Sequence, residues 1–398
     1  MDMIPSNSIK TELRRRAALL MSPLQTPGDK SRGRVFDCAA PSGRELARRS
    51  RRPAVFTRVR RLCWLAGLLS GLALAKAPAF PGATSRYHAW VAATLPGPLE
   101  GLAVDRKGQL FTAVAATGQI FRLGDRTGYR YIATVPNEAL GRAGRTWGLE
   151  FDRVGYLYAA YVWHYSETDE MDPLHLACRN SRDVYTGVYR IDVATGQVIP
   201  WLTKRSGWPV CFPDDIAIDS AGDLYVTDLT LSGIWKLSPD RRFILWASGP
   251  LLQWPPPPYD EIPEGVNDLA LSGDGRSIYA VTDGTPMLLR IPIRPNGSAG
   301  HPQVLAEGLS PLDGIALDGR GNIYVSEILR SDISVFSPDG RQRILIATAG
   351  TAPLINPTSL IYRAGVLCTA NLGWNRVPPP RTVVCIRGFR RPRHSGTR

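Results

Sequence analysis

Four polar residues that lie far apart in the chain carry side-chain oxygens suited to a hard cation: Glu100, Asp214, Asn267 and Asp313. Gathering three carboxylates without a cation is costly, because like charges repel and buried ions are disfavoured. Ca²⁺ accepts carboxylate and amide oxygens at about six to eight positions, with water filling the remainder. The absence of His and Cys from this set argues against a softer transition metal. The residue types therefore predict a divalent-cation site, with Ca²⁺ as the expected ion.

The four residues share one position in a phrase that the chain repeats six times between residues 100 and 363. The phrase begins with a residue that is polar in most copies, followed by a small or acidic residue. The pattern aliphatic-x-aliphatic-Asp comes next, and a Gly turn and a stretch such as Leu-Tyr-Val end the phrase. We call the first positions the hub column. They are Glu100, Trp147, Asp214, Asn267, Asp313 and Thr358, which lie 47, 67, 53, 46 and 45 residues apart. A repeat of this length built from short strands is typical of a β-propeller.

Each repeat unit predicts one blade of such a propeller. It holds four alternating or apolar stretches separated by Gly, Asp-Gly or Asn turns, the pattern of a four-stranded antiparallel meander. We therefore expect an all-β, six-bladed β-propeller over residues 85–387. The sixth unit lacks a fourth strand, and residues 87–94 (YHAWVAAT) are expected to supply it. Pairing the two ends in one blade closes the ring and removes its free edges.

The hub column opens the innermost strand of every predicted blade, so its residues are expected around one mouth of the central channel. An alternative is a channel without metal, since ordered water can satisfy buried polar groups. Further polar residues, which we call the end column, close the second strands of four units. They are Asp228, Asp283, Glu327 and Asn371. They are suited either to supporting metal ligands or to capping turns, and we favour capping.

Three of the hub phrases also carry a family resemblance. Glu100 lies in PLEGLAVD, Asn267 in GVNDLALSGDGRSIYAVTD and Asp313 in LDGIALDGRGNIYVS. These phrases resemble the metal-binding motifs of the senescence marker protein (regucalcin)/gluconolactonase family, which is related to paraoxonases, diisopropylfluorophosphatase and strictosidine synthase. Asp268 replaces the Gly that follows the family's asparagine. Asp214 stands where the family has another Asn, which adds a negative charge.

The resemblance implies a six-bladed propeller that holds a divalent cation in its hub and hydrolyses a lactone, an ester or a phosphotriester. It implies metal ligands at Glu100, Asp214, Asn267 and Asp313. Asp313 would also act as general base or nucleophile.

Substrate contacts are expected from the channel mouth and from two long loops, 163–184 and 249–266, because long loops in compact domains are often functional. The candidate contacts are Trp147, His164, Trp254 and Tyr259. For His164 we favour a solvated loop residue over a catalytic one. Trp254 is equally well explained as a side chain that packs beneath the proline run.

The formal net charge of +13 lies at the chain ends. Residues 1–61 carry 15 Lys and Arg against 5 acidic residues, and residues 387–398 carry 5 Arg and no acid. Residues 77–386 carry 27 basic and 30 acidic residues. Nucleic-acid binding requires a basic patch on the domain itself. We therefore expect no nucleic-acid partner, and a monomer that binds a small-molecule substrate.

The N-terminal part of the chain is typical of a targeting segment. An apolar run (LCWLAGLLSGLALA) follows several Arg residues and ends in small-residue cleavage sites within residues 62–77. The run is shorter than the about 20 residues that span a bilayer. We expect a cleaved signal peptide and a secreted or periplasmic protein, with a membrane anchor as the alternative. Residues 1–61 are predicted to be disordered, and residues 388–398 form a basic tail.

Four cysteines follow the signal segment: Cys178, Cys211, Cys368 and Cys385. An even number in an exported chain favours disulfides. The most local pairing joins Cys178 to Cys211 and Cys368 to Cys385. Four free buried thiols are the alternative, and the lack of a C-x-x-C spacing argues against a zinc–thiolate site.

Propellers serve as binding modules as readily as enzymes. The hypothesis we favour is an exported, metal-dependent hydrolase of a lactone or ester. One alternative is a non-catalytic scaffold of NHL-like repeats, which the degenerate sixth copy and the long loops support. The other is an enzyme that resembles strictosidine synthase and uses a hub acid without metal.

Overall fold

The computed structural model describes most of the predicted propeller: residues 87–124, 128–137, 142–143, 145–164, 184–203, 207–253, 265–373 and 381–388. All of them belong to one compact unit, Ala79–Arg398. The predictions made for residues 1–61, for the signal segment and for the tail after residue 388 lie outside the described residues. No helix in the described ranges has the length and apolar character needed to cross a membrane.

The described residues form six four-stranded antiparallel sheets, which are the blades. From the innermost strand outward, blade 1 consists of β2 (Leu99–Val104), β3 (Leu110–Val114), β4 (Gln119–Leu123) and β5 (Tyr129–Thr134). Blade 2 consists of β8 (Arg145–Phe151), β9 (Tyr156–His164), β10 (Val184–Asp192) and β11 (Gln197–Thr203). Blade 3 consists of β12 (Pro213–Ile218), β13 (Leu224–Asp228), β14 (Gly233–Leu237) and β15 (Phe243–Ser248).

The second half of the ring follows the same order. Blade 4 consists of β16 (Val266–Leu271), β17 (Ser277–Thr282), β18 (Met287–Pro292) and β19 (Gln303–Glu307). Blade 5 consists of β20 (Leu312–Leu317), β21 (Ile323–Glu327), β22 (Asp332–Phe336) and β23 (Arg343–Ala347). Blade 6 consists of β24 (Pro357–Arg363), β25 (Val366–Asn371), β26 (Thr382–Arg387) and β1 (His88–Thr94). A small hairpin of β6 (Pro136–Asn137) and β7 (Arg142–Ala143) lies between blades 1 and 2 in the chain.

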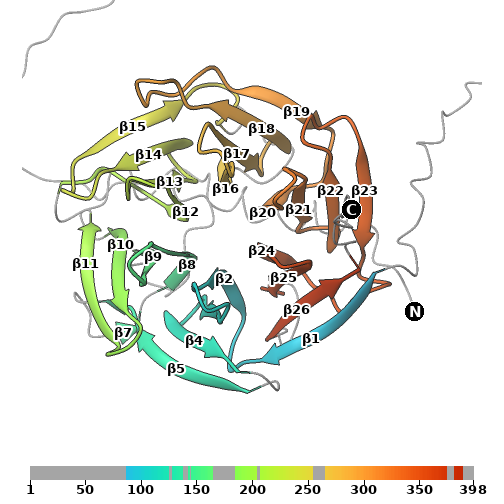
Figure 1. The fold of residues 1–398 in the computed structure, drawn as a ribbon. Coiled ribbons are helices and arrows are strands. Elements are labelled where there is room, and N and C mark those ends of the chain that lie inside the picture. Colours follow the sequence, from blue (N-terminus) through green and yellow to red (C-terminus); the bar gives the residue numbers. More distant parts are fainter. Residues whose placement is uncertain are drawn as a thin grey trace, which may run out of the picture. The chain divides into compact units, whose positions relative to one another are not determined.

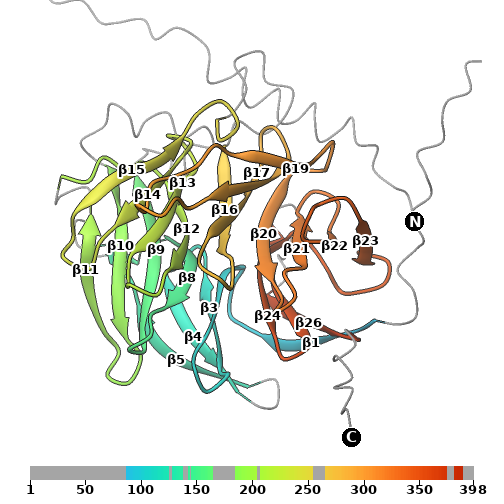
Figure 2. The ribbon, with the colours of Figure 1, turned by 45° about the horizontal axis from the view of Figure 1, so that its top comes forward.

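The blades are arranged as a closed ring around a central channel (Figure 1). Each innermost strand contacts the innermost strands of the blades on both sides. The ring closes where β1, from the start of the propeller, pairs antiparallel with β26, from its end. This pairing is also visible in the tilted view (Figure 2). The predicted all-β, six-bladed architecture and its closing strand are confirmed.

One type of turn explains the Asp and the Gly of the repeated phrase. The Gly that follows the innermost strand has a positive φ in every blade, from 67° at Gly275 to 110° at Gly155. Glycine adopts this conformation at little cost. The preceding Asp caps the turn: Asp152 Oδ1 accepts the backbone N–H groups of Val154, Gly155 and Tyr156 at 2.7 to 2.9 Å. The repeated Asp therefore stabilises a hairpin, whereas the first residue of the phrase is left for the hub.

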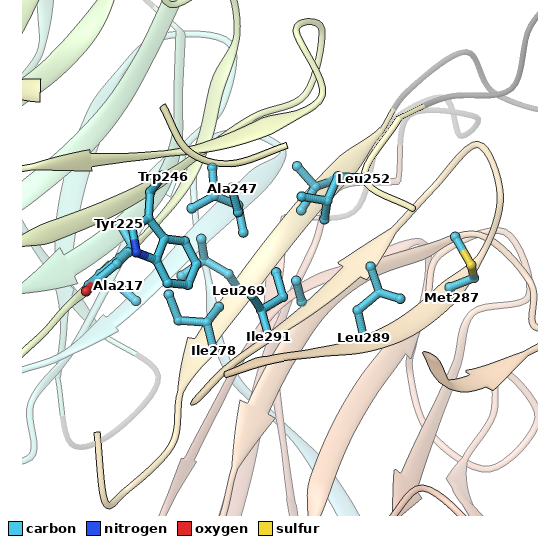
Figure 3. Packing of buried hydrophobic residues seen from close by; sticks show 13 residues of the cluster. Ala217, Tyr225, Trp246, Ala247, Leu252, Leu269, Ile278, Met287, Leu289 and Ile291 are labelled. Atoms are coloured by element: carbon cyan, nitrogen blue, oxygen red, sulfur yellow. The ribbon is translucent and has the colours of Figure 1, made fainter. Parts of the chain in front are cut away.

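Apolar side chains fill the space between neighbouring blades (Figure 3). Between blades 3 and 4, Tyr225 and Trp246 belong to the same buried cluster as Leu269, Ile278 and Ile291. The Tyr225 and Trp246 rings meet edge to face, with their centroids 5.0 Å apart. Full burial of one large apolar side chain contributes about 1.5 to 3 kcal/mol. These contacts hold the blades face to face and so set the distances between the innermost strands.

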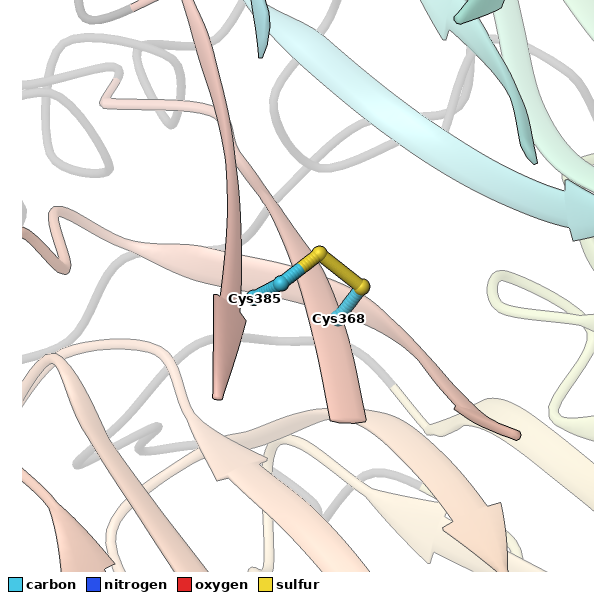
Figure 4. The surroundings of a disulfide bond; sticks show 2 residues. All are labelled: Cys368 and Cys385. Carbon is cyan, nitrogen blue, oxygen red and sulfur yellow. A yellow bond between two sulfur atoms is a disulfide. The ribbon is translucent and has the colours of Figure 1, made fainter. Parts of the chain in front are cut away.

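A disulfide ties the C-terminal strand of the propeller to its neighbour in blade 6 (Figure 4). Cys368 of β25 and Cys385 of β26 are paired across the ladder, and their sulfur atoms are bonded. The predicted pairing of these two residues is confirmed. Cys211 is also disulfide-bonded, and its predicted partner, Cys178, lies outside the described residues. The alternative of free thiols is therefore wrong for the described cysteines.

We expect removal of the Cys368–Cys385 bond to destabilise the propeller. The two residues are 17 apart in sequence, and a loop of that size restricts the unfolded chain by about 3 kcal/mol in the chain-entropy model. Urea unfolding of wild type and of the Cys368→Ala/Cys385→Ala variant measures the difference in free energy of unfolding. Reduced wild-type protein lacks the bond but keeps both cysteine side chains, so it controls for the side-chain volume that the alanine variant loses. An unchanged free energy in both samples would show that the bond adds nothing to ring closure.

Candidate functional site

Every innermost strand carries a β-bulge at the same place, and the hub column lies in it. In β16 the pairing skips from Val266 to Leu269, so Asn267 and Asp268 together stand opposite a single residue of β17. The innermost strands of the other five blades show the same shift. A bulge re-aims side chains and is frequent beside functional sites. The hub column thus occupies the equivalent position in all six innermost strands.

The four predicted ligands are all buried within these bulges. Glu100 is 6% exposed, Asp214 8%, Asn267 5% and Asp313 7%. They come from β2, β12, β16 and β20, that is from blades 1, 3, 4 and 5. Burial of charge so close to the channel axis favours a compensating cation.

Asn267 has a side-chain oxygen that suits a cation. Its Nδ2 donates a hydrogen bond to Asp283 Oδ2 at 3.1 Å. Its Oδ1 is buried and accepts no hydrogen bond from the described residues. An unsatisfied buried acceptor carries a desolvation cost of about 1 to 3 kcal/mol. An amide oxygen is a ligand that Ca²⁺ accepts, so the donor chemistry of this position fits such an ion.

The other two hub-column residues are used differently. The Thr358 hydroxyl donates to the backbone carbonyl of Glu100 at 3.2 Å, which links blade 6 to blade 1. Trp147 is partly exposed, and its ring packs on Phe212 with the centroids 5.3 Å apart. Val162 and Leu229 complete this apolar cluster. The cluster gives Trp147 an apolar surface beside the hub column, and its contact with substrate stays a prediction.

The second bulge position holds a pair of carboxyl groups that bridge blades 3, 4 and 5. Asp215 Oδ2 accepts the Leu269 backbone N–H at 3.4 Å, and Asp268 Oδ2 accepts the Ile315 backbone N–H at 3.0 Å. The two carboxyl groups also hydrogen-bond each other. The pKa of Asp268 is raised well above its usual range, mainly by burial and secondly by the charge of Asp215. The pair therefore holds a proton in place of a second negative charge.

Glycine occupies the second bulge position in blades 1, 2 and 5, and the contact there is closer. A Cβ on Gly101 would lie 2.1 Å from the carbonyl oxygen of Trp147, and one on Gly314 would lie 2.3 Å from that of Thr358. Neighbouring innermost strands thus meet backbone to backbone at these positions. Between blades 3 and 4 and between blades 4 and 5, Asp215 and Asp268 connect neighbouring innermost strands instead, through hydrogen bonds from backbone N–H groups.

Glu150 adds a third carboxyl group to this region. It lies on β8, at the place where blades 1, 3, 4 and 5 have Ala. It keeps some accessible surface but is surrounded by protein. Burial, with a smaller contribution from the charge of Asp215, raises its pKa from 4.5 to about 8.

The sequence analysis missed the roles of Asp215, Asp268 and Glu150. A signal was present, because two copies of the phrase have Asp in its second position where three others have Gly. Likewise Glu150 interrupts a column of Ala. Alignment of the repeats marks these positions as unusual, but it does not show that the carboxyl groups meet.

The end column divides into two groups. Asp228 accepts the backbone N–H groups of Cys211, Phe212 and Leu231 at 2.9 to 3.1 Å. Asn371 accepts the Ile355 N–H at 3.0 Å. The predicted capping of turns and loops is confirmed for these two residues.

Glu327 and Asp283 are the remaining members of the end column. Glu327 bonds the Ser334 hydroxyl at 2.9 Å and forms an ion pair with Arg343, in addition to a longer bond from the Ser310 N–H. Asp283 instead bonds the side chain of Asn267 in the hub column. The contact of Asp283 fits the interpretation that we did not favour, in which an end-column residue supports a residue of the hub column.

Several predicted substrate contacts have no described side chain. Trp254 and Tyr259 lie outside the described residues. His164 ends β9, where its backbone pairs with Val184. The loops predicted at 163–184 and 249–266 are described only at their ends.

In the described part of the chain, no group of three or more His, Cys, Asp or Glu side chains is arranged so as to hold a metal ion by itself. A cation in the hub would therefore depend on the amide oxygen of Asn267, and on water, as well as on carboxylates.

The raised pKa of Glu150 predicts a pH-dependent stability. The pKa of Glu150 is higher in the folded protein than in the unfolded chain. The stability that protonated Glu150 contributes is therefore complete below about pH 4.5 and is lost as the pH rises through about 8. The free energy of unfolding of chelator-treated wild type should fall with a slope of at most about 1.4 kcal/mol per pH unit from this group. Glu150→Gln should flatten that slope in urea unfolding between these limits.

The matched control for this prediction is Glu307→Gln, since Glu307 is an exposed glutamate on the outer strand β19. It should keep the wild-type slope. Equal slopes for wild type and Glu150→Gln would mean that Glu150 is not held protonated.

Comparison with known proteins agrees with this architecture. Residues 183–365 match the family model described as "SMP-30/Gluconolactonase/LRE-like region". The chain is 23% identical to lactonase drp35 of Staphylococcus aureus (strain USA300) over 253 residues, which are 61% of this chain and 67% of that protein.

Solved structures share the fold at lower identity. A gluconolactonase from Xanthomonas campestris has a TM-score of 0.56 at 14% identity, over 76% of this chain and 89% of that one. A luciferin-regenerating enzyme has a TM-score of 0.56 at 12% identity, over 76% of this chain and 96% of that one. The chain is thus a six-bladed β-propeller that is similar to SMP-30/gluconolactonase-like proteins, and the family-model match spans less than half of its length.

Proposed function

We propose that this protein is a metal-dependent hydrolase that opens a lactone or ester, with a divalent cation, Ca²⁺ above all, bound in the hub. One observation carries the proposal. The buried Oδ1 of Asn267, which accepts no hydrogen bond from the described residues, lies at the same bulge level as three buried carboxylates. The names of the relatives, a lactonase and a gluconolactonase, support the reaction class.

The residues that would hold the cation are those of the hub column in blades 1, 3, 4 and 5: Glu100, Asp214, Asn267 and Asp313. Their oxygens are the hard donors that Ca²⁺ prefers. Asp214 brings a third carboxylate to the set, which strengthens the attraction for a divalent ion.

When bound, the cation polarises the substrate carbonyl and lowers the pKa of water. Asp313 would take a proton from the attacking water as general base, or attack the carbonyl itself as nucleophile. In the general-base route, water adds across the acyl C–O bond, and the proton that Asp313 takes from the water passes to the leaving oxygen. In the nucleophile route, the acyl C–O bond breaks as an ester with Asp313 forms, the leaving oxygen takes a proton from water, and a further water would hydrolyse that ester to return the carboxylate. Trp147 would exclude water from one side of the pocket through its apolar cluster with Phe212.

We also propose that the protein works outside the cytoplasm, as a secreted or periplasmic monomer or through a membrane anchor. The signal-like segment at 62–77 supports export. The Cys368–Cys385 disulfide supports it further, because such bonds persist in oxidising compartments.

Metal removal is the first test. The purified protein should contain a divalent cation near one per chain by elemental analysis, and a chelator should remove both lactone hydrolysis and part of the thermal stability. Ca²⁺ at about 100 times its Kd should restore about 2.7 kcal/mol of stability. Hydrolysis that survives chelation points to the metal-free alternative. Absence of both metal and activity points to the scaffold.

Replacement of the proposed base is the second test. Asp313→Asn should lower kcat for simple lactones by about 100-fold or more, the usual size of a general-base contribution, while the melting temperature stays near that of wild type. Asp318→Asn, in the same blade, is the matched control. Asp318 caps the turn after β20, so its loss should lower stability and leave kcat unchanged. Full activity of Asp313→Asn would remove that residue from the chemistry.

A further inference from the structure

Asp283 contacts the hub although it is not part of the hub column. It follows β17 directly and is only 2% exposed. Its Oδ2 accepts the hydrogen bond from Asn267 Nδ2 at 3.1 Å, and Asn267 is 5% exposed. The contact therefore joins two buried side chains on neighbouring strands of blade 4.

The chemistry of this contact determines how the Asn267 amide is oriented. A carboxylate only accepts hydrogen bonds, whereas an amide has a donor side and an acceptor side. The NH₂ group of Asn267 must therefore point at Asp283, and its Oδ1 must point the other way. This Oδ1 is the buried oxygen that accepts no hydrogen bond from the described residues. Without the carboxylate, either face of the amide would be free to turn toward the channel.

Among the end-column contacts of the described residues, the bond to a hub side chain is found in blade 4. In blades 3 and 6, Asp228 and Asn371 bond the backbone of the segments that lead into the innermost strand. In blade 5, Glu327 bonds Ser334 and Arg343. Asp283 reaches the side chain of a hub residue, and that residue is the one neutral ligand of the proposed set.

We propose that Asp283 is a positioning residue that directs the amide oxygen of Asn267 toward the cation. This inference rests on the proposed metal-dependent function and extends it to a residue that does not touch the ion. The principle is general, since partners that orient metal ligands commonly change metal affinity by about 10- to 100-fold when they are replaced.

The test uses three variants of the full chain and measures the Kd for Ca²⁺ by calorimetry after chelator treatment. Asp283→Asn keeps the size of the side chain but can donate to Asn267 Oδ1, so the amide is free to reverse. The swapped pair, Asn267→Asp/Asp283→Asn, restores the hydrogen bond in the reverse direction. The new amide at position 283 donates to the new carboxylate at position 267, whose other oxygen faces the hub. Asp228→Asn is the matched control, because Asp228 is an equally buried end-column residue that accepts the backbone N–H groups of Cys211, Phe212 and Leu231.

The expected results separate positioning from a structural role. Asp283→Asn should weaken Ca²⁺ binding by about 10-fold or more, and the swapped pair should return the Kd to within about threefold of wild type, as coupled neighbours do. Asp228→Asn should lower the melting temperature but leave the Kd near that of wild type. With lactone as substrate, kcat for Asp283→Asn should recover at saturating Ca²⁺.

Other outcomes overturn the proposal. They are a wild-type Kd for Asp283→Asn, an equal loss of affinity in Asp228→Asn, or a folded swapped pair that binds as weakly as the single variant. If Asp283→Asn does not fold, the swapped pair decides, and failure of both to fold makes the role structural. Failure of wild type itself to bind Ca²⁺ is a separate result that refutes the proposed metal site and this inference with it.

Discussion

Main-chain pairing between β1 and β26 joins the two ends of the propeller, and the candidate site depends on this ladder. Glu100 comes from blade 1 and Asp313 from blade 5, and the innermost strand of blade 6 contacts the innermost strands of both. Thr358 of blade 6 takes part directly through its bond to the backbone of Glu100. The disulfide in the same blade ties β26 to β25. A loosened ladder would separate the ligands without altering any ligand side chain.

The hub gathers more acidic groups than the predicted ligands alone, and the protein limits the resulting repulsion by retaining protons. Asp215 and Asp268 share a hydrogen bond, and the pKa of Glu150 is raised. The first two carboxyl groups also accept backbone N–H bonds from the following blade. The same groups therefore align blades 3, 4 and 5 while they reduce the negative charge beside the proposed cation.

The repeat lets one structural position serve different purposes. The first bulge residue is acidic or amide in four blades, while Trp147 forms part of an apolar wall and Thr358 links two blades. The end column varies in the same way, since Asp228 holds a loop and Asp283 holds a hub side chain. Because the backbone is equivalent in each blade, such differences arise from the side chains and their neighbours. Function in this fold is therefore assigned residue by residue.

The sequence by itself determined the blade count, the closing strand and the position of the hub column, because each depends on short-range patterns repeated along the chain. Turn glycines, capping Asp residues and alternating strands act locally, and the missing sixth-blade strand had one candidate at 87–94. Only the tertiary structure decided that Asp215 meets Asp268 and that Asp283 accepts a hydrogen bond from Asn267. These contacts depend on strand register and on the spacing between blades, which large side chains at the interfaces set. The bulge that places the hub column adds one residue to the ladder, and strand periodicity alone does not mark where that residue falls.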